Sequence, residues 1–197
     1  MACAESSFMG GGGISGQTTI QTKPRIINSI PNCNALYRKE CWLCNRQDES
    51  FLKGQDAEFN LRLTRQGWKY LQIPGAQVIH KRETSLLLYA GKMFRYGRAA
   101  SHIIKKHGLW GIKRYWYSVG ITLFFTALTG LSFIALVKKR HSLLVSLLGC
   151  LYLLTLAATG ILQIRKKSLT VCFMAIPVLL VQHISYTIGV IIGLISD

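Results

Sequence analysis

The sequence predicts a mixed α/β N-terminal region, then basic amphipathic helices, then three transmembrane α-helices. Half of the 197 residues are apolar, although the formal net charge is +16. These two properties are separated along the chain, because residues 1–116 hold 18 of the 24 Lys and Arg and the remainder is mostly aliphatic. We therefore expect three regions, at residues 1–83, 84–116 and 117–197.

The C-terminal region contains three apolar runs without charged residues, at about 117–137, 142–163 and 169–195. A helix needs roughly 20 such residues to cross a hydrocarbon core about 30 Å thick. The connections at 138–141 and 165–167 are short and basic, so the expected arrangement is up, down and up. A buried helical hairpin of a soluble protein is the alternative, and it is disfavoured because the runs have no polar face.

The basic residues also predict an orientation. Both connections between the apolar runs are cationic, so the positive-inside rule does not separate them. The segment from Lys81 to Arg114 holds nine Lys or Arg against one acid, Glu83. We therefore expect a multi-pass protein of the cell (cytoplasmic) membrane, with its N-terminal region in the cytoplasm near anionic lipid headgroups. Nucleic-acid binding is the competing interpretation of this charge, and no basic–aromatic motif supports it, so we expect no nucleic-acid partner.

The N-terminal region contains one well-defined local unit. Asp56 is expected at the N-cap of a helix over Ala57–Gln66, and Gly67 is expected as the C-cap. Trp68–Ile73 alternates in the manner of a strand, and Ala76–His80 is expected as a second strand. A helix followed by two strands indicates an α/β arrangement.

Thr84–His107 is expected to form a basic amphipathic helix. Leu87, Phe94 and Gly97 belong to its apolar stripe, and lysines and arginines surround the stripe. A helix of this kind beside apolar runs is typical of one that lies on the membrane surface. Leu109–Trp116 continues the pattern with aromatic residues that favour the membrane interface.

Residues 54–63, GQDAEFNLRL, and the GWKY that begins at Gly67 resemble the acceptor-side motif of family 2 glycosyltransferases. In that family an acidic pair opens a helix. Asp56 matches the second acid, whereas Gln55 departs from the commoner first one. Residues 34–40 and the Asp48-Glu49-x-Phe51 stretch resemble the approach to this motif in members of the succinoglycan and polysaccharide biosynthesis type. The resemblance implies the second half of a GT-A-like domain followed by a membrane anchor.

The resemblance also implies an activity and the residues that carry it. The chain would belong to a membrane-bound enzyme that transfers a sugar, with inversion, from a nucleotide-sugar to a lipid-linked or polysaccharide acceptor. Asp56 would be the general base that takes the proton of the acceptor hydroxyl. Gln55, Arg95 and Arg98 would bind the acceptor or the leaving diphosphate, since guanidinium groups match phosphate oxygens. An ordinary helix cap for Asp56 and lipid-headgroup contact for the arginines remain as alternatives.

Two parts of the family's catalytic domain are missing from this sequence. No Asp-x-Asp occurs, although the family uses that motif to hold a divalent metal, Mg²⁺ or Mn²⁺. No βαβ pattern precedes residue 34, so the nucleotide-binding half is expected on a separate chain or on a missing segment. The chain would then be a fragment or a split subunit that is inactive alone. Cys41-x-x-Cys44 lacks the further ligands of a zinc site, and free thiols are expected.

Two other classes of function remain open. The chain could be a non-catalytic membrane adaptor or assembly subunit, or a small component of a transporter or channel. Gln182 and His183 are polar within the third apolar run. His183 is a functional candidate because an ionisable residue inside a membrane is costly, although Ser185 and Tyr186 could satisfy it structurally. His80 is expected to be structural.

Overall fold

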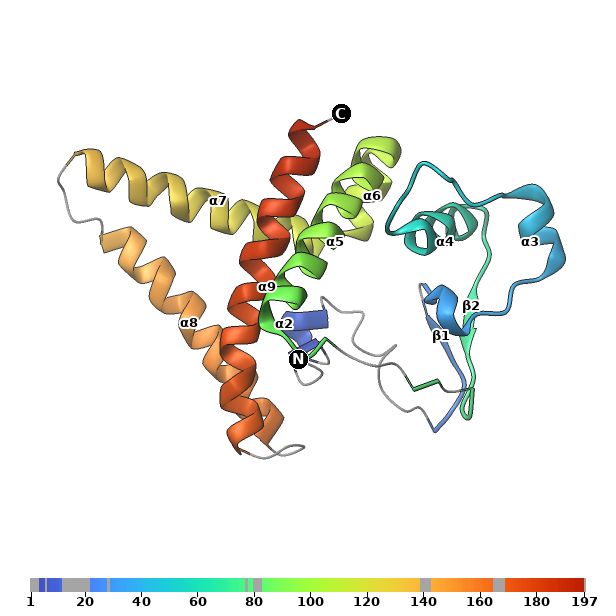
Figure 1. Ribbon diagram of the computed structural model, residues 1–197, viewed down its shortest axis with the longest axis horizontal. Coiled ribbons are helices and arrows are strands. Elements are labelled where there is room, and N and C mark those ends of the chain that lie inside the picture. The colour runs from blue at the N-terminus through green and yellow to red at the C-terminus, as the bar shows by residue number, and fades with distance from the viewer. Residues whose placement is uncertain are drawn as a thin grey trace.

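The computed structural model describes residues 4–5, 7–11, 22–27, 29–76, 78–79, 83–138, 143–164 and 169–196. In chain order the elements are α2 (Phe8–Gly11), β1 (Arg25–Ile27), the short 3-10 helix η2 (Asn32–Asn34), α3 (Lys39–Cys44), α4 (Gln55–Arg65), β2 (Tyr70–Gln72), α5 (Leu86–His107), α6 (Leu109–Arg114), α7 (Trp116–Val137), α8 (Leu143–Ile164) and α9 (Leu169–Ile195). A lobe of α3, α4, β1 and β2 lies on one side, and α7 and α8 splay out on the other (Figure 1). α5, α6 and α9 lie between them.

The lobe packs around α4. Phe59 and Leu63 on α4 are buried together with Cys41 of α3 and Tyr70 of β2. β1 and β2 form one antiparallel pair, in which Ile27 lies opposite Tyr70. The inner face of this small sheet therefore covers α4.

The prediction of a GT-A-like α/β domain is wrong. Among the described residues, the strands are the two three-residue segments β1 and β2, and most of the rest is helical. The strand expected over Trp68–Ile73 is reduced to its central three residues. Of Ala76–His80, Gln77 and His80 lie outside the described residues, and the others belong to no strand.

α5 begins within two residues of the helix predicted over 84–107, and it ends at the same residue. Gly108 ends it with a φ of +55°, a conformation that is strained for a residue with a Cβ. α6 follows immediately and folds back onto α5, where a Cβ on Gly111 would lie 2.7 Å from Cα of Ile104. The predicted break between the two basic segments is therefore a tight turn at a glycine.

α5 and α9 run side by side in the same direction. Near the start of α5, the Tyr89 hydroxyl donates to Oε1 of Gln182 at 2.6 Å. At the other end, Nζ of Lys105 donates to the carbonyl oxygen of Ser196 at 2.6 Å. The C-terminal half of α9 therefore packs along almost the whole of α5.

Small residues allow the backbones of α5 and α9 to touch. A Cβ on Gly97 would overlap the carbonyl oxygen of Tyr186, and one on Gly193 would overlap the hydroxyl of Ser101. Gly189 meets α5 in the same way. Gly189 and Gly193 are four residues apart, the spacing that lets helices approach closely in membranes.

Among the described residues, two helices are long and apolar enough to cross a membrane, not the expected three. They are Trp116–Val137 in α7 and Phe173–Ile195 in α9. In the part of the chain that the structure describes, the apolar stretch of α8 is shorter, Leu143–Thr159. It stops short of the roughly 20 residues that a span requires. The run predicted over 142–163 is thus helical but does not qualify as a span.

One hydrophobic cluster joins the long helices. Tyr89 of α5, Tyr152 and Leu156 of α8 and Leu179 of α9 are buried together, and α7 adds partly buried aromatic rings. Outside this cluster, α7 and α8 leave many large apolar side chains exposed, including Phe133. Surfaces of this kind are stable where lipid or another protein covers them.

Candidate functional site

The segment that resembles the acceptor motif forms α4. Its N-cap is Gly54, with a φ of +80°, so Asp56 is the second residue of the helix and not the expected N-cap. Glycine suits this position for two reasons, because left-handed backbone disfavours other residues and because a Cβ would lie 3.1 Å from Cβ of Ala99 on α5. The C-cap is Gln66, so the predicted C-cap, Gly67, with a φ of +92°, lies one residue beyond the observed one.

Asp56 has a partly exposed carboxylate on the first turn of α4. Oδ1 accepts a hydrogen bond of 2.8 Å from the backbone N–H of Ala57. Burial and, secondarily, the charge of Asp56 and other neighbours raise the pKa of Tyr37 to about 12. Burial is also the main cause that raises the pKa of Tyr115 to about 12, and Asp56 adds to it. Asp56 therefore lies within electrostatic reach of two tyrosine hydroxyls.

The other predicted site residues do not gather around Asp56. Gln55 is the first residue of α4 and is partly exposed, and Arg95 is exposed on α5. Arg98 packs with its backbone against Gly193 of α9, and its Nε is buried without a hydrogen-bond partner among the described residues. Within the described ranges, no ion pair joins Asp56 to either arginine. The structure thus places the expected base and the expected phosphate ligands on separate helices.

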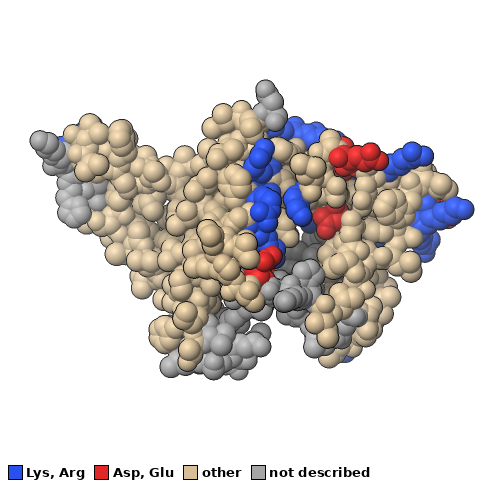
Figure 2. Space-filling view, in the orientation of Figure 1, with Lys and Arg blue, Asp and Glu red and all other residues tan. Residues whose placement is uncertain are grey.

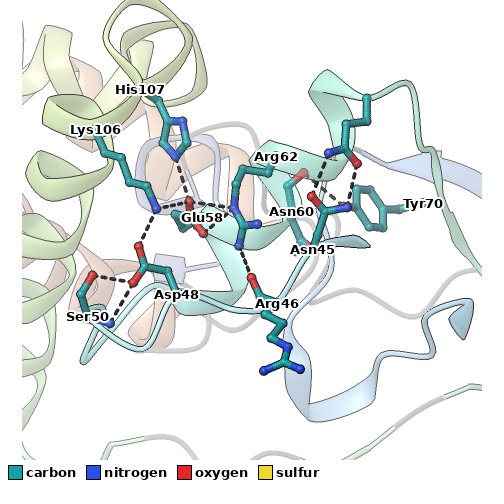
Figure 3. Close-up of polar contacts among 11 residues, drawn as sticks. Asn45, Arg46, Asp48, Ser50, Glu58, Asn60, Arg62, Tyr70, Lys106 and His107 are labelled. Atoms are coloured by element: carbon teal, nitrogen blue, oxygen red, sulfur yellow. Dashed lines mark hydrogen bonds and ion pairs between the residues drawn. The ribbon is translucent and has the colours of Figure 1, made fainter. Parts of the chain in front are cut away.

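The strongest polar constellation is centred on Glu58, one turn into α4 (Figure 3). Its side chain is fully buried. Arg62 donates from Nε to both carboxylate oxygens, at 2.9 and 3.0 Å. Lys106 and His107, at the end of α5, reach Oε1 at 2.8 and 3.0 Å. We call Glu58, Arg62, Lys106 and His107 the Glu58 cluster.

The Glu58 cluster controls the charge of its carboxylate. Burial alone would raise the pKa of Glu58, but hydrogen bonds from Lys106 and His107 and the charge of Arg62 outweigh it, so the pKa is lowered. Since a carboxylate oxygen only accepts, Nε2 of His107 must carry the proton. A buried, fully paired carboxylate of this kind is a poor general base, because it has no lone pair facing solvent.

Asp48 extends the Glu58 cluster to the surface. Its carboxylate accepts hydrogen bonds from Nζ of Lys106 and from the backbone and hydroxyl of Ser50. These hydrogen bonds lower the pKa of Asp48 well below its usual range. The loop before α4 is thereby held against α5 by the same lysine that binds Glu58.

Two side-chain amides hold the rest of the lobe to α4. The buried Asn60 donates from Nδ2 to the hydroxyl of Ser29 at 2.8 Å and to the carbonyl oxygen of Ile30 at 2.6 Å. Its Oδ1 accepts from the Tyr37 hydroxyl at 2.9 Å. Asn45 exchanges a reciprocal amide pair with Gln66, at 2.9 and 2.8 Å. Buried and satisfied amides such as these indicate structural roles.

Sequence reasoning found only part of the Glu58 cluster. The four-residue spacing of Glu58 and Arg62 predicts a favourable ion pair within one helix, and the structure confirms this pair and buries the Glu58 side chain. Lys106 and His107 lie 48 and 49 residues away in the sequence. No local pattern could have linked them, because only the packing of α4 on α5 brings them together.

No metal centre forms in the described part of the chain. There, no group of three or more His, Cys, Asp or Glu residues gathers that could hold an ion. Cys33, Cys41, Cys44 and Cys150 are free thiols.

No protein-family model, curated protein or solved structure matches the chain. The glycosyltransferase resemblance therefore rests on the residues quoted from the sequence alone.

Proposed function

We propose that the chain is the acceptor-side, membrane-bound portion of a glycosyltransferase that works with a nucleotide-binding portion carried elsewhere. The observation that carries this proposal is the carboxylate of Asp56. It lies on the first turn of α4, partly exposed, with a single hydrogen bond from its own helix. It is thus accessible to an acceptor hydroxyl, whereas the nearby carboxylate of Glu58 is fully buried and paired.

The chemistry proposed for Asp56 is proton removal from the acceptor. As the acceptor hydroxyl attacks the anomeric carbon, its proton passes to Oδ2 of Asp56 while the bond from the sugar to the diphosphate breaks. The N–H of Ala57 fixes the carboxylate but also stabilises its negative charge. The proton would therefore transfer late, when the attacking oxygen has become acidic.

The positive charge for the leaving diphosphate is proposed to come from α5. Arg95 is exposed and can reach a ligand, whereas Arg98 is tied into the contact with α9. Arg95 is accordingly the better candidate of the two. The donor nucleotide and any divalent metal would be held by the other portion of the enzyme.

The outer face of the small sheet formed by β1 and β2 is apolar and exposed, which favours a partner protein that covers it. Ile26 and Leu71 lie opposite each other across β1 and β2, and both side chains are more than half exposed. Ile73 beside them is exposed as well. An isolated two-stranded sheet is only marginally stable, and an apolar outer face favours further protein that covers it. We propose that the nucleotide-binding portion does so.

The placement in the membrane follows the charge of the chain. α7 and α9 are the candidate spans, and α5 and α6 place basic residues next to them. We propose a multi-pass protein of the cytoplasmic membrane with the lobe on the cytoplasmic side. Asp56 would then face the surface at which a lipid-linked acceptor arrives.

The proposal is tested by sugar transfer in membranes that contain the chain and a partner with the missing portion. Asp56→Asn should lower kcat about 100-fold or more, because loss of a general base typically removes a factor of 10² to 10⁴. Glu49→Gln is the matched control, since Glu49 is an exposed acid on the preceding turn. An unchanged rate for Asp56→Asn would rule out the proposed base.

A membrane adaptor is the second candidate function. The Glu58 cluster favours it, because the strongest polar contacts of the lobe are structural and hold α4 on α5. An adaptor should bind its partner equally well with Asp56→Asn, whereas Leu71→Asp should abolish the complex. The two functions are separated by measuring complex formation and sugar transfer on the same pair of variants.

A further inference from the structure

The end of α9 is held against the end of α5. Nζ of Lys105, in the last turn of α5, donates to the carbonyl oxygen of Ser196, which follows directly on α9, at 2.6 Å. One turn earlier in α9, a Cβ on Gly193 would lie 3.1 Å from Cα of Arg98, so the two backbones touch there. Figure 1 shows the two helix ends side by side. The last part of α9 is therefore fixed to α5.

α5 is held just as firmly to the lobe. Lys106 donates from Nζ to the carboxylate of Asp48 and, at 2.8 Å, to Oε1 of Glu58. Further back along α5, a Cβ on Gly54 would lie 3.1 Å from Cβ of Ala99. Two consecutive lysines of α5 thus bind the end of α9 and the acids of the lobe. No lipid bilayer can separate groups that are this close, so the lobe and the end of α9 lie on the same side of the membrane.

This shared region belongs outside the hydrocarbon core. α5 has no acidic residue and carries five basic ones, Lys92, Arg95, Arg98, Lys105 and Lys106. A basic side chain costs about 2.5 to 3.5 kcal/mol at the centre of a bilayer. Figure 2 shows charged side chains gathered over α5 and the lobe, whereas few lie over α7 and α8. The contact between Lys105 and the end of α9 therefore lies with the lobe in water or among headgroups.

The position of the two ends restricts the number of membrane crossings. The lobe precedes α7 and Ser196 follows α9, so an even number of crossings is needed to bring them to the same side. Three crossings, one for each apolar run of the sequence, would place them on opposite sides, and the hydrogen bond between Lys105 and Ser196 could not form. Two crossings agree with the two helices that, among the described residues, are long and apolar enough to span.

We propose that the chain crosses the membrane twice and that the end of α9 returns to the side of the lobe. Lys138, which follows α7, would then lie on the opposite side. The inference rests on the membrane placement proposed above and not on sugar transfer. It places the end of α9 on the side at which the nucleotide-binding portion is proposed to bind.

Thiol labelling in cells tests the number of crossings. The chain has six natural cysteines, and alanine replaces all of them except where one serves as the reporter. Three versions carry one thiol each. The first keeps Cys44, which is exposed in the lobe; the second has Lys138→Cys at an exposed position; the third has a cysteine on a short Gly-Ser extension after Asp197. A membrane-impermeant maleimide is applied to intact and to permeabilised cells, and the labelled fraction is measured by mass spectrometry.

In intact cells, Cys44 and the extension thiol should both stay unlabelled, whereas Lys138→Cys should be labelled. All three thiols should be labelled after permeabilisation. Labelling of the extension thiol in intact cells that protect Cys44 would overturn the proposal and leave the proposed sugar transfer untouched. Protection of all three thiols would overturn the crossings themselves. Labelling of Cys44 and the extension thiol but not of Lys138→Cys would support two crossings and contradict a cytoplasmic lobe.

A second measurement keeps all natural cysteines and the full chain. Green fluorescent protein or periplasmic alkaline phosphatase is fused after Asp197 and produced in bacterial cells. The first reporter fluoresces only when it folds in the cytoplasm, and the second is active only outside it. With the lobe in the cytoplasm, the first fusion should fluoresce and the second should be inactive. The reverse result would overturn the return of α9 even if the cysteine replacements had disturbed the fold.

Discussion

Replacing Glu58 with glutamine removes one charge from the interior and leaves the shape of the side chain unchanged. In the native chain the carboxylate is fully buried, and Arg62, Lys106 and His107 all lie within 3.0 Å of it. In Glu58→Gln the amide nitrogen must face one of these donors, and the buried cations lose their counter-charge. The contact between α4 and the end of α5 should weaken most.

The size of the effect follows from the burial of the pair. Removing one partner of a buried, hydrogen-bonded ion pair typically costs about 3 to 5 kcal/mol, because the remaining charge stays desolvated. Lys106 is about one third exposed, so water can screen part of its charge, and the lower end of this range applies. About 3 kcal/mol corresponds to roughly a hundredfold change in the equilibrium for opening α4.

Amide hydrogen exchange of the purified protein in detergent measures this opening directly. Amides of α4 should exchange roughly a hundredfold faster in Glu58→Gln, whereas α9 should be unaffected. Glu49→Gln is the control, because it removes the same charge from an exposed turn. If α4 exchanges at the same rate in both variants, the Glu58 cluster contributes little free energy and the reasoning is refuted.

The remaining predictions concern pH, the amide network and the glycine contact. Because the folded pKa of Glu58 is lowered, its stabilisation is present above the ordinary value of 4.5 and is lost as the pH falls toward the folded pKa. The protection of α4 amides, which is their exchange rate relative to the unfolded chain at the same pH, should therefore fall on acidification, and it should fall much less in Glu58→Gln. Asn60→Ala should lower the free energy of unfolding of the lobe by about 2 to 3 kcal/mol, because it leaves buried hydrogen-bond partners unpaired. Denaturant titration measures this loss. A loss of free energy smaller than that caused by a substitution at an exposed position would contradict the prediction. Gly189→Val should lower the melting temperature in detergent, at a cost of roughly 3 kcal/mol, because the added side chain forces α5 away from α9. Gly149→Val is the control and should leave the melting temperature unchanged. Equal melting temperatures for the two variants would show that the close approach of the helices is unimportant.

Local patterns in the sequence predict the helices well. Apolar residues at four-residue spacing define the buried face of α4, so its existence follows from short-range information, although the predicted N-cap, Asp56, lies two residues after the observed one, Gly54. α5 is equally predictable, because its amphipathic pattern continues without interruption from Leu86 to Gly108. In both cases the residues that start and stop the helix lie within the segment itself.

The sheet is predicted poorly because strand pairing is a long-range event. β1 pairs with β2 across more than 40 residues, and nothing local to Arg25–Ile27 distinguishes a strand from a loop. Conversely, Ala76–His80 is predicted as a second strand, but the described residues of this range belong to no strand. The apolar run after residue 142 predicts a span by its length, whereas in the part of the chain that the structure describes the apolar stretch of α8 is Leu143–Thr159.

The sequence alone predicts that this chain is largely helical in its C-terminal half and that most of its Lys and Arg lie in the N-terminal part. The structure decides that two of the described helices, and not the expected three, are long and apolar enough to cross a membrane. Tertiary structure alone decides which polar groups meet. Lys106 reaches Glu58, and Gln182 and His183 reach the backbone of α2, across 48 to 174 residues of sequence. Such contacts depend on how whole helices pack, and packing is set by the summed shape of many side chains rather than by any local motif.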